Sequence, residues 1–258
     1  MEEKAKLLPF RMYANVYFIG CEAVSVHLLD TSAGLVLIDT GYPNMLGLII
    51  ENIEKMGFSP RDIKAILHTH GHIDHYGCTR ELVAMSGAKT YISRIDNQIL
   101  DGTLDLSWTK ELSLEPIPPF SCDVLLEDGD VIDFGDTQVR CVLTPGHTDG
   151  VMSYIITLPD GKVAGMHGGV GLNTLKSGFL KRYGMSYDCR RLFRESLKRL
   201  AFEQVDLVLG NHPGQTRTLR KMLKVLEGDG EILDRDEWQR FLASNEKKLD
   251  ELIEADPE

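Results

Sequence analysis

Short apolar and β-branched runs alternate along the chain with segments of helical periodicity. Such runs, bounded by turn residues, are typical of β-strands. The run that ends at Asp39 is apolar at nearly every position, as expected of a strand buried on both faces. We therefore expect strands at 16–20, 24–30, 35–39, 63–69, 90–93, 123–126, 131–134, 137–144, 151–158, 162–166 and 205–210. We expect helices at 44–56, 79–86, 189–201, 218–227 and 234–253.

The expected elements form two β-rich halves, each followed by helices, without a linker or low-complexity break. Because each sheet can bury one face on the other, the order predicts helix–sheet–sheet–helix layers within one domain over 1–258. The fold class is α/β, an αββα four-layer sandwich with a C-terminal helix. Residues 228–258 are expected to be an acidic helical extension packed on this body, because their apolar positions mostly recur at helical spacing.

Two stretches show no regular pattern. The stretch 104–120 contains three prolines and little periodicity, and it is interpreted as a long surface connection. The second stretch is 168–187. The sequence pattern of these two stretches does not define the shape of a substrate pocket.

Composition narrows the choice of partners. The net charge of −11 and the isoelectric point near 5.2 argue against a nucleic-acid partner, whose phosphates are bound by Lys and Arg. Much of this charge lies in Glu227–Glu258, where twelve acidic residues face four basic ones, so it says little about the substrate. No run of about 18 apolar residues exists, so no membrane partner is expected.

The N-terminal segment and the cysteines indicate the compartment. The first twenty residues lack the apolar stretch and the small-residue cleavage site of a secretory signal, so a cytoplasmic location is expected. The five cysteines are scattered without CxxC spacing, which is typical of reduced thiols.

The sequence HTHGHIDH, residues 68–75, places four of the eight histidines within eight positions. His70, His72, Asp74 and His75 follow directly after a predicted strand. Their side chains diverge on so short a loop, so one tetrahedral ion cannot use all four, whereas two neighbouring ions can share them. Imidazole and carboxylate are ligands that zinc prefers. Because protonated imidazoles repel one another, a purely structural role for this cluster is disfavoured.

Two further histidines occupy the same kind of position. His147 follows a strand in TPGHTDG, and His212 follows a strand in GNHPGQT. Loops after strands gather at one rim of a sheet, so these histidines are candidates for the remaining ligands. Taken alone, each is more typical of a turn residue. His27 is expected in the core or on the surface, and His68 in packing or beside the ligands.

Together these motifs resemble the metallo-β-lactamase superfamily, an αββα sandwich with a two-metal site. The resemblance spans about residues 15–225, and it is closest to the third subclass of metallo-β-lactamases, on the full first-metal histidine set, the Asp-His pair and His212-Pro213. It implies two Zn²⁺ per chain. The first would be bound by His70, His72 and His147, and the second by Asp74, His75 and His212. Asp39 in LIDTG matches an early family aspartate that supports the metal loop.

The chain also departs from the family pattern. Most of the hydrolases have a metal-bridging aspartate after the strand near 163–170, but this chain reads VAGMHGGVGLN. The third subclass lacks that aspartate and usually offers serines nearby, and here Gly168–Gly171 stand instead. His167 in this loop is a further candidate for contact with the metals or the substrate. β-Lactamases are normally exported, so the lack of an export signal expected here is a second departure from that family.

The resemblance implies a dinuclear zinc-dependent hydrolase in which metal-bound hydroxide attacks the carbonyl of a cyclic amide or ester. Asp74 and His147 are its candidate catalytic residues, and β-lactam hydrolysis is one activity of this kind. A lactonase, thioesterase or phosphodiesterase on the same metals is the alternative within enzymes. A non-catalytic metal-binding scaffold is the alternative outside them. A small-molecule substrate is expected, and the oligomeric state stays open.

Overall fold

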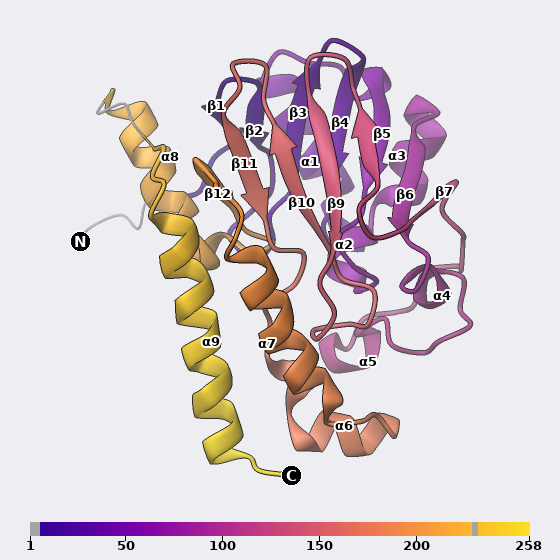
Figure 1. Ribbon diagram of the computed structural model, residues 1–258. Coiled ribbons are helices and arrows are strands. Elements are labelled where there is room, and N and C mark those ends of the chain that lie inside the picture. Colours follow the sequence, from indigo (N-terminus) through magenta and orange to yellow (C-terminus); the bar gives the residue numbers. More distant parts are fainter. Residues whose placement is uncertain (1–5, 229–231) are drawn as a thin grey trace, which may run out of the picture.

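The computed structural model describes residues 6–228 and 232–258 (Figure 1). The first five residues of the N-terminal segment lie outside the described residues. So do residues 229–231 of the predicted acidic extension.

The first sheet has seven strands, which lie side by side in chain order. β1 to β4 pair antiparallel, and β4 to β7 pair parallel. The strands are β1 (Phe10–Tyr13), β2 (Val16–Phe18), β3 (His27–Thr31), β4 (Gly34–Ile38), β5 (Ile63–Leu67), β6 (Lys89–Ser93) and β7 (Val124–Leu126).

The second sheet has five strands in the order β12-β11-β10-β9-β8. All neighbours are antiparallel except β11 and β12, which are parallel. The predicted Pro-Asp-Gly hairpin between β10 and β11 is present, with Gly161 at φ 82°. The strands are β8 (Val131–Asp133), β9 (Gln138–Leu143), β10 (Met152–Thr157), β11 (Val163–Met166) and β12 (Leu207–Leu209).

Helices cover the outer faces of both sheets and the end at which the long loops gather. The α-helices are α1 (Leu46–Lys55), α2 (Ile73–Tyr76), α3 (Thr79–Ser86), α4 (Asn97–Leu100), α5 (Thr109–Leu112), α6 (Ser177–Tyr183), α7 (Asp188–Leu200), α8 (Thr218–Leu226) and α9 (Glu237–Ala255). The 3-10 turns are η1 (Pro43–Met45), η2 (Pro60–Asp62), η3 (Asn173–Leu175) and η4 (Pro213–Gln215).

The side chains of β4 point alternately into two apolar clusters, which shows how the layers form. Val36 and Ile38 join the apolar cluster between the two sheets, together with Tyr154 of β10. Leu35 and Leu37 point the other way, into the cluster beneath α1 and α3. Because successive side chains of a strand face opposite sides, one apolar run feeds two cores.

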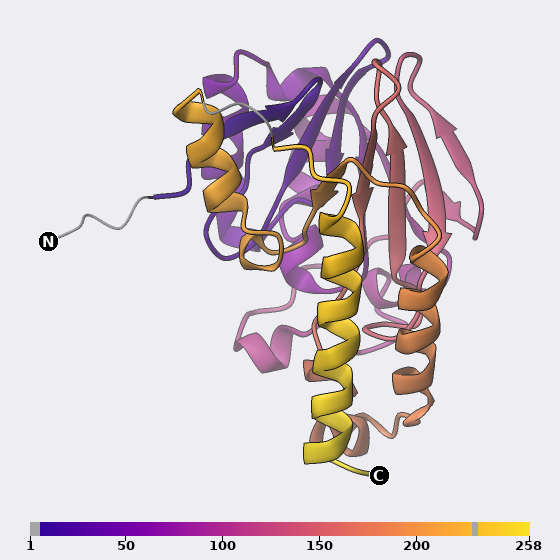
Figure 2. The same cartoon turned by 60° about the vertical axis from the view of Figure 1, so that its left-hand side comes forward.

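The outer face of the second sheet is covered by α7 and α9, which run side by side (Figures 1 and 2). Phe193 of α7 and Leu249 of α9 are fully buried there, and the Trp238 indole donates a hydrogen bond to the carbonyl of Leu200 at 2.9 Å. The predicted αββα sandwich with a C-terminal helix is thereby confirmed.

The structure differs from the sequence prediction at several elements. β1 was not predicted, and the strand expected from 24 begins only at His27. The stretch 104–120 is not loop throughout, because it contains α5, and 168–187 contains α6. These helices have four and seven residues, too short to show a reliable period. All five cysteines are free.

α9, with 19 residues, is rich in charged side chains. No helix among the described residues is long and apolar enough to cross a membrane.

Candidate metal centre

The six candidate ligands all lie on segments that follow strands. Residues 68–75 continue from β5, His147 lies beyond β9, and His212 directly follows β12. α2 begins at Ile73, with His72 as the residue before its first turn, so Asp74 and His75 project from a short helix. Both sheets therefore contribute side chains to one place.

The first group consists of His70, His72 and His147. One nitrogen from each lies within 4.8 Å of the others. The Nε2 atom of His147 is 3.1 Å from Nδ1 of His72. The three ring centroids are 4.7–4.8 Å apart, with the planes nearly perpendicular. Three imidazole nitrogens that converge in this way leave room for one tetrahedral ion.

The second group consists of Asp74, His75 and His212. Its three ligand atoms also lie within 4.8 Å of one another. Oδ2 of Asp74 is 3.4 Å from Nε2 of His75 and 3.7 Å from Nε2 of His212. The groups adjoin, because the rings of His70 and His75 are 4.3 Å apart.

Hydrogen bonds on the outer side of each group fix the rings. The Nδ1 atoms of His70, His147 and His212 lie 2.6–2.8 Å from the carbonyl oxygens of Gly168, Gly171 and Ala23, respectively. Each Nδ1 is thus the donor, so the unprotonated Nε2 is the nitrogen that each ring offers to the site. Nε2 of His70 is buried without any hydrogen-bond partner. This unsatisfied acceptor and the all-nitrogen-and-carboxylate donor set fit zinc.

The charges of the second group are balanced internally. Burial lowers the pKa of His75, but the carboxylates of Asp74 and Asp39 outweigh it and raise that pKa to about 10. Burial opposes ionisation of Asp74, yet the neighbouring histidines hold its pKa below the usual range. Burial lowers the pKa of His147 to about 4.

Asp39 forms hydrogen bonds to the segment that carries the candidate ligands. Its carboxylate accepts hydrogen bonds from the backbone and hydroxyl of Thr69, both at 2.8 Å, and from Nδ1 of His75 at 2.8 Å. Asp39 has φ 62°, a left-handed conformation that Asp tolerates better than most residues. The side chain is fully buried, so it acts on position rather than on substrate.

Asp96 joins the two metal loops, and the sequence analysis missed it. Its Oδ2 accepts from the backbone of Gly71 at 2.8 Å and from the hydroxyl of Thr148 at 2.6 Å. Its Oδ1 accepts from the backbone of Gly150 at 2.8 Å. Burial raises the pKa of Asp96 to about 6, against these hydrogen bonds. In the sequence, only its position shortly after a predicted strand could have marked Asp96 as a candidate site residue.

The glycines at 168–171 have a structural reason. The carbonyls of Gly168 and Gly171 orient His70 and His147, so this loop supports the ligands with its backbone. A Cβ at Gly169 would lie 2.8 Å from Cδ2 of His147, and one at Gly171 would lie 2.9 Å from Cε1. Side chains at these positions would collide with the imidazole.

The three remaining histidines lie outside both groups. His167 is buried 6.0 Å from the ring of Phe193, and its Nδ1 accepts from the backbone of Gly169 at 3.1 Å. The structure therefore does not bring His167 to the candidate ligands, although its Nε2 has no partner. His27 is buried in β3, and His68 lies against Thr79, as the sequence suggested.

Replacing Gly169 with alanine should lower zinc affinity at least about tenfold, because its Cβ would push the His147 ring out of position. Gly178→Ala in α6 is the matched control, since nothing lies within 4 Å of its Cβ. Competition with a chromogenic chelator would measure both affinities. Equal affinities in the two variants would contradict the role assigned to this contact.

A small apolar cavity of about 30 Å³ opens beside the first group. His72 and His147 form one wall, and the other apolar lining residues are Ile95, Ile99, Leu104, Leu106, Phe179 and Met185. The ring of Trp108 lies 5.3 Å from that of His72 and 5.0 Å from that of Phe179. The sequence analysis missed these residues, because most of them come from 104–120 and 168–187, and Ile95 and Ile99 lie in the segment after β6. Among the described residues, no lysine or arginine lines this cavity.

The sandwich and the two ligand groups at the loop end of its sheets define a class of metal-binding αββα proteins. The family model of the metallo-beta-lactamase superfamily matches residues 19–164, which is more than half of the chain. The chain belongs to this superfamily.

Curated relatives are similar over part of their length. A probable metallo-hydrolase of Bacillus subtilis is 32% identical over 164 residues, 58% of this chain and 58% of that protein. A hydroxyacylglutathione hydrolase of Maricaulis maris is 33% identical over 107 residues, 42% of this chain and 33% of that protein. The chain thus aligns with less than two thirds of these relatives.

Solved structures match over nearly the whole chain. A subclass B3 metallo-β-lactamase of Bradyrhizobium japonicum has a TM-score of 0.82 and 27% identity, covering 97% of this chain and 95% of that one. A metallo-β-lactamase of Cronobacter sakazakii has a TM-score of 0.84 and 27% identity, with the same coverage. The resemblance to the third subclass is confirmed.

Proposed function

We propose that the protein is a dinuclear zinc-dependent hydrolase that opens a neutral, apolar cyclic ester or amide. The observation that carries this proposal is the pair of adjoining ligand groups next to an apolar cavity. Zinc, when bound, lowers the pKa of water toward neutrality and polarises a carbonyl oxygen. Hydrolases among the relatives support this reaction class.

The protein's own residues would do three things. His70, His72 and His147 would hold the first zinc ion, and backbone carbonyls fix the outer nitrogens of His70 and His147. Asp74, the one carboxylate in either group, would bring negative charge to the second. Trp108 and Phe179 would exclude water on one side of the substrate.

The lining of the cavity favours an uncharged substrate. β-Lactam antibiotics carry a carboxylate, which enzymes bind with Lys, Arg or hydroxyl donors. This cavity has no lysine or arginine among the described residues, and it contains Asp96 and the exposed Asp149. Its two hydroxyl side chains are already engaged, Thr148 with Asp96 at 2.6 Å and Thr174 with His147 at 3.2 Å. At about 30 Å³ the cavity holds only a small apolar group of the substrate, and because no cation faces that group, lactonase activity is our preferred form of the proposal.

The deciding experiment measures zinc content per chain together with initial rates on an apolar lactone and a chromogenic cephalosporin. We expect two zinc ions, faster lactone turnover, and loss of activity when a chelator removes the metal. Full turnover in verified metal-free protein would overturn the metal mechanism. Faster turnover of the cephalosporin would overturn the preference for a neutral substrate. Bound metal without turnover of any ester or amide would favour a scaffold.

A further inference from the structure

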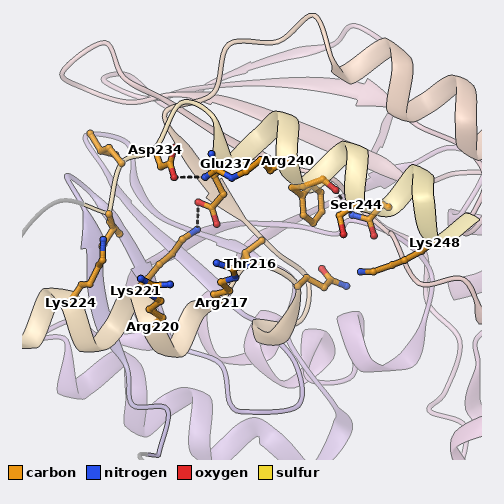
Figure 3. A pocket seen from close by; sticks show the side chains of 15 residues that line it. Thr216, Arg217, Arg220, Lys221, Lys224, Asp234, Glu237, Arg240, Ser244 and Lys248 are labelled. Carbon is orange, nitrogen blue, oxygen red and sulfur yellow. Dashed lines mark hydrogen bonds and ion pairs between the residues drawn. The ribbon is translucent and has the colours of Figure 1, made fainter.

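A second cavity of about 360 Å³ lies between α8 and α9, and none of the six candidate metal ligands lines it (Figure 3). Its walls come from η4, the start of α8, residues 232–234 and one face of α9. This volume lies within the range of small-molecule sites, about 300–1,000 Å³.

The cavity is strongly basic in an acidic protein. Six lining side chains are cationic and two are anionic, whereas the whole chain carries a net charge of −11. The cationic residues are Arg217, Arg220, Lys221, Lys224, Arg240 and Lys248. Arg220, Lys221 and Lys224 are spaced by one, three and four positions on α8, so they lie close together on that helix, and Arg217 directly precedes its first residue.

Within residues 6–228 and 232–258, ion pairs neutralise only part of this positive charge. Lys221 is buried, and its ammonium binds the carboxylate of Glu237 at 2.9 Å and the carbonyl of Val208 at 2.6 Å. Arg240 pairs with Asp234. Among the described residues, no acidic side chain forms an ion pair with Arg217, Arg220, Lys224 or Lys248. Like charges gathered around a cavity repel one another unless an anion enters it.

The cavity also has an apolar side. Phe241 and Ile232 are buried beside it, and Leu233 is half-buried. In Figure 3, Lys221 extends from α8 toward Glu237, and Lys248 extends from α9 toward the space between the helices. A ligand that fits both sides has several negative charges at one end and an organic group at the other.

We propose that this cavity binds an organic diphosphate of the nucleoside diphosphate class. Guanidinium and ammonium groups are the side chains that bind phosphate oxygens, and four unpaired cations match a doubly phosphorylated end. Phe241, Ile232 and Leu233 would contact the organic part. The site is independent of the proposed hydrolase activity, because it shares no residue with either metal group.

Calorimetric titration of zinc-loaded protein with ADP and with pyrophosphate tests this proposal. We expect saturable binding tighter than about 1 mM, with ADP at least as tight as pyrophosphate. Citrate, a polyanion without phosphate, should bind more weakly than either. Equal binding of citrate, or no saturable binding of ADP, would overturn the proposal.

Charge-reversal variants locate the binding, because ADP also coordinates zinc. Arg220→Glu and Lys248→Glu should each weaken ADP binding at least about tenfold. Lys247→Glu is the matched control: it changes the same charge on the same helix, but Lys247 does not line the cavity and pairs only with Glu251 at 3.6 Å. Equal affinity for ADP in Lys247→Glu and Lys248→Glu would place the binding elsewhere. Retained zinc content in all three variants would verify that they fold.

Discussion

Asp74→Asn should lower kcat about 100-fold or more while the protein keeps its fold. Asp74 is the only carboxylate in the two ligand groups, and its Oδ2 lies within 3.7 Å of both second-group imidazoles. Even partners outside a ligand set change activity about 10–100-fold, so loss of a ligand charge should do at least as much. Asparagine has nearly the same volume, so packing is preserved.

Steady-state rates, zinc content and thermal unfolding would be measured on Asp74→Asn and on Asp62→Asn. Asp62 is an exposed aspartate at the opposite end of β5, so its variant removes the same charge without touching the site. We expect the second zinc to be weakened only in Asp74→Asn. Unchanged turnover in that variant would remove Asp74 from the chemistry.

Asp39→Asn should lower the free energy of unfolding by about 2 kcal/mol and zinc affinity about 10–100-fold. The carboxylate accepts hydrogen bonds from Thr69 and His75 at full burial, and an amide would set an N–H against one of these donors. Asparagine keeps the left-handed backbone accessible, so the change isolates the charge.

Urea unfolding of the metal-free protein and chelator competition would measure the two effects of Asp39→Asn. Asp30→Asn in β3 is the control, since Asp30 is exposed and its side chain does not contact the metal loops. If both variants unfolded at the same urea concentration, the buried hydrogen bonds of Asp39 would not contribute to stability.

Much of the fold could be predicted because its strands are buried on both faces. β4 and β5 are almost entirely apolar, and their patterns alone mark them as central strands. β1 escaped prediction because its pattern of buried and exposed positions spans four residues. The short helices α5 and α6 gain their order from contacts with the site, which no local pattern encodes.

The ligand groups could be predicted because residue types that bind metal ions lie close together in the sequence. Three histidines and an aspartate within six residues have few other uses. Apart from Asp39, which the family resemblance indicated, the residues that support these ligands could not be predicted. Asp96 binds groups 25 and 54 residues away, and nothing in SRIDN distinguishes it from an ordinary turn aspartate. In the sequence, the missing bridging aspartate was only a departure from the family pattern. In the structure, the backbone of 168–171 accepts hydrogen bonds from two of the candidate ligand histidines.

The origin of the ligands has a kinetic consequence. Each group takes two residues from the loop after β5 in the first sheet and one from a loop of the second sheet. An ion in either group would therefore join the sheets as a cross-link does, and it could leave readily only after they begin to separate. Metal release and global unfolding should then share a rate-limiting step, so that a metal-loaded chain persists in denaturant for longer than its equilibrium stability implies.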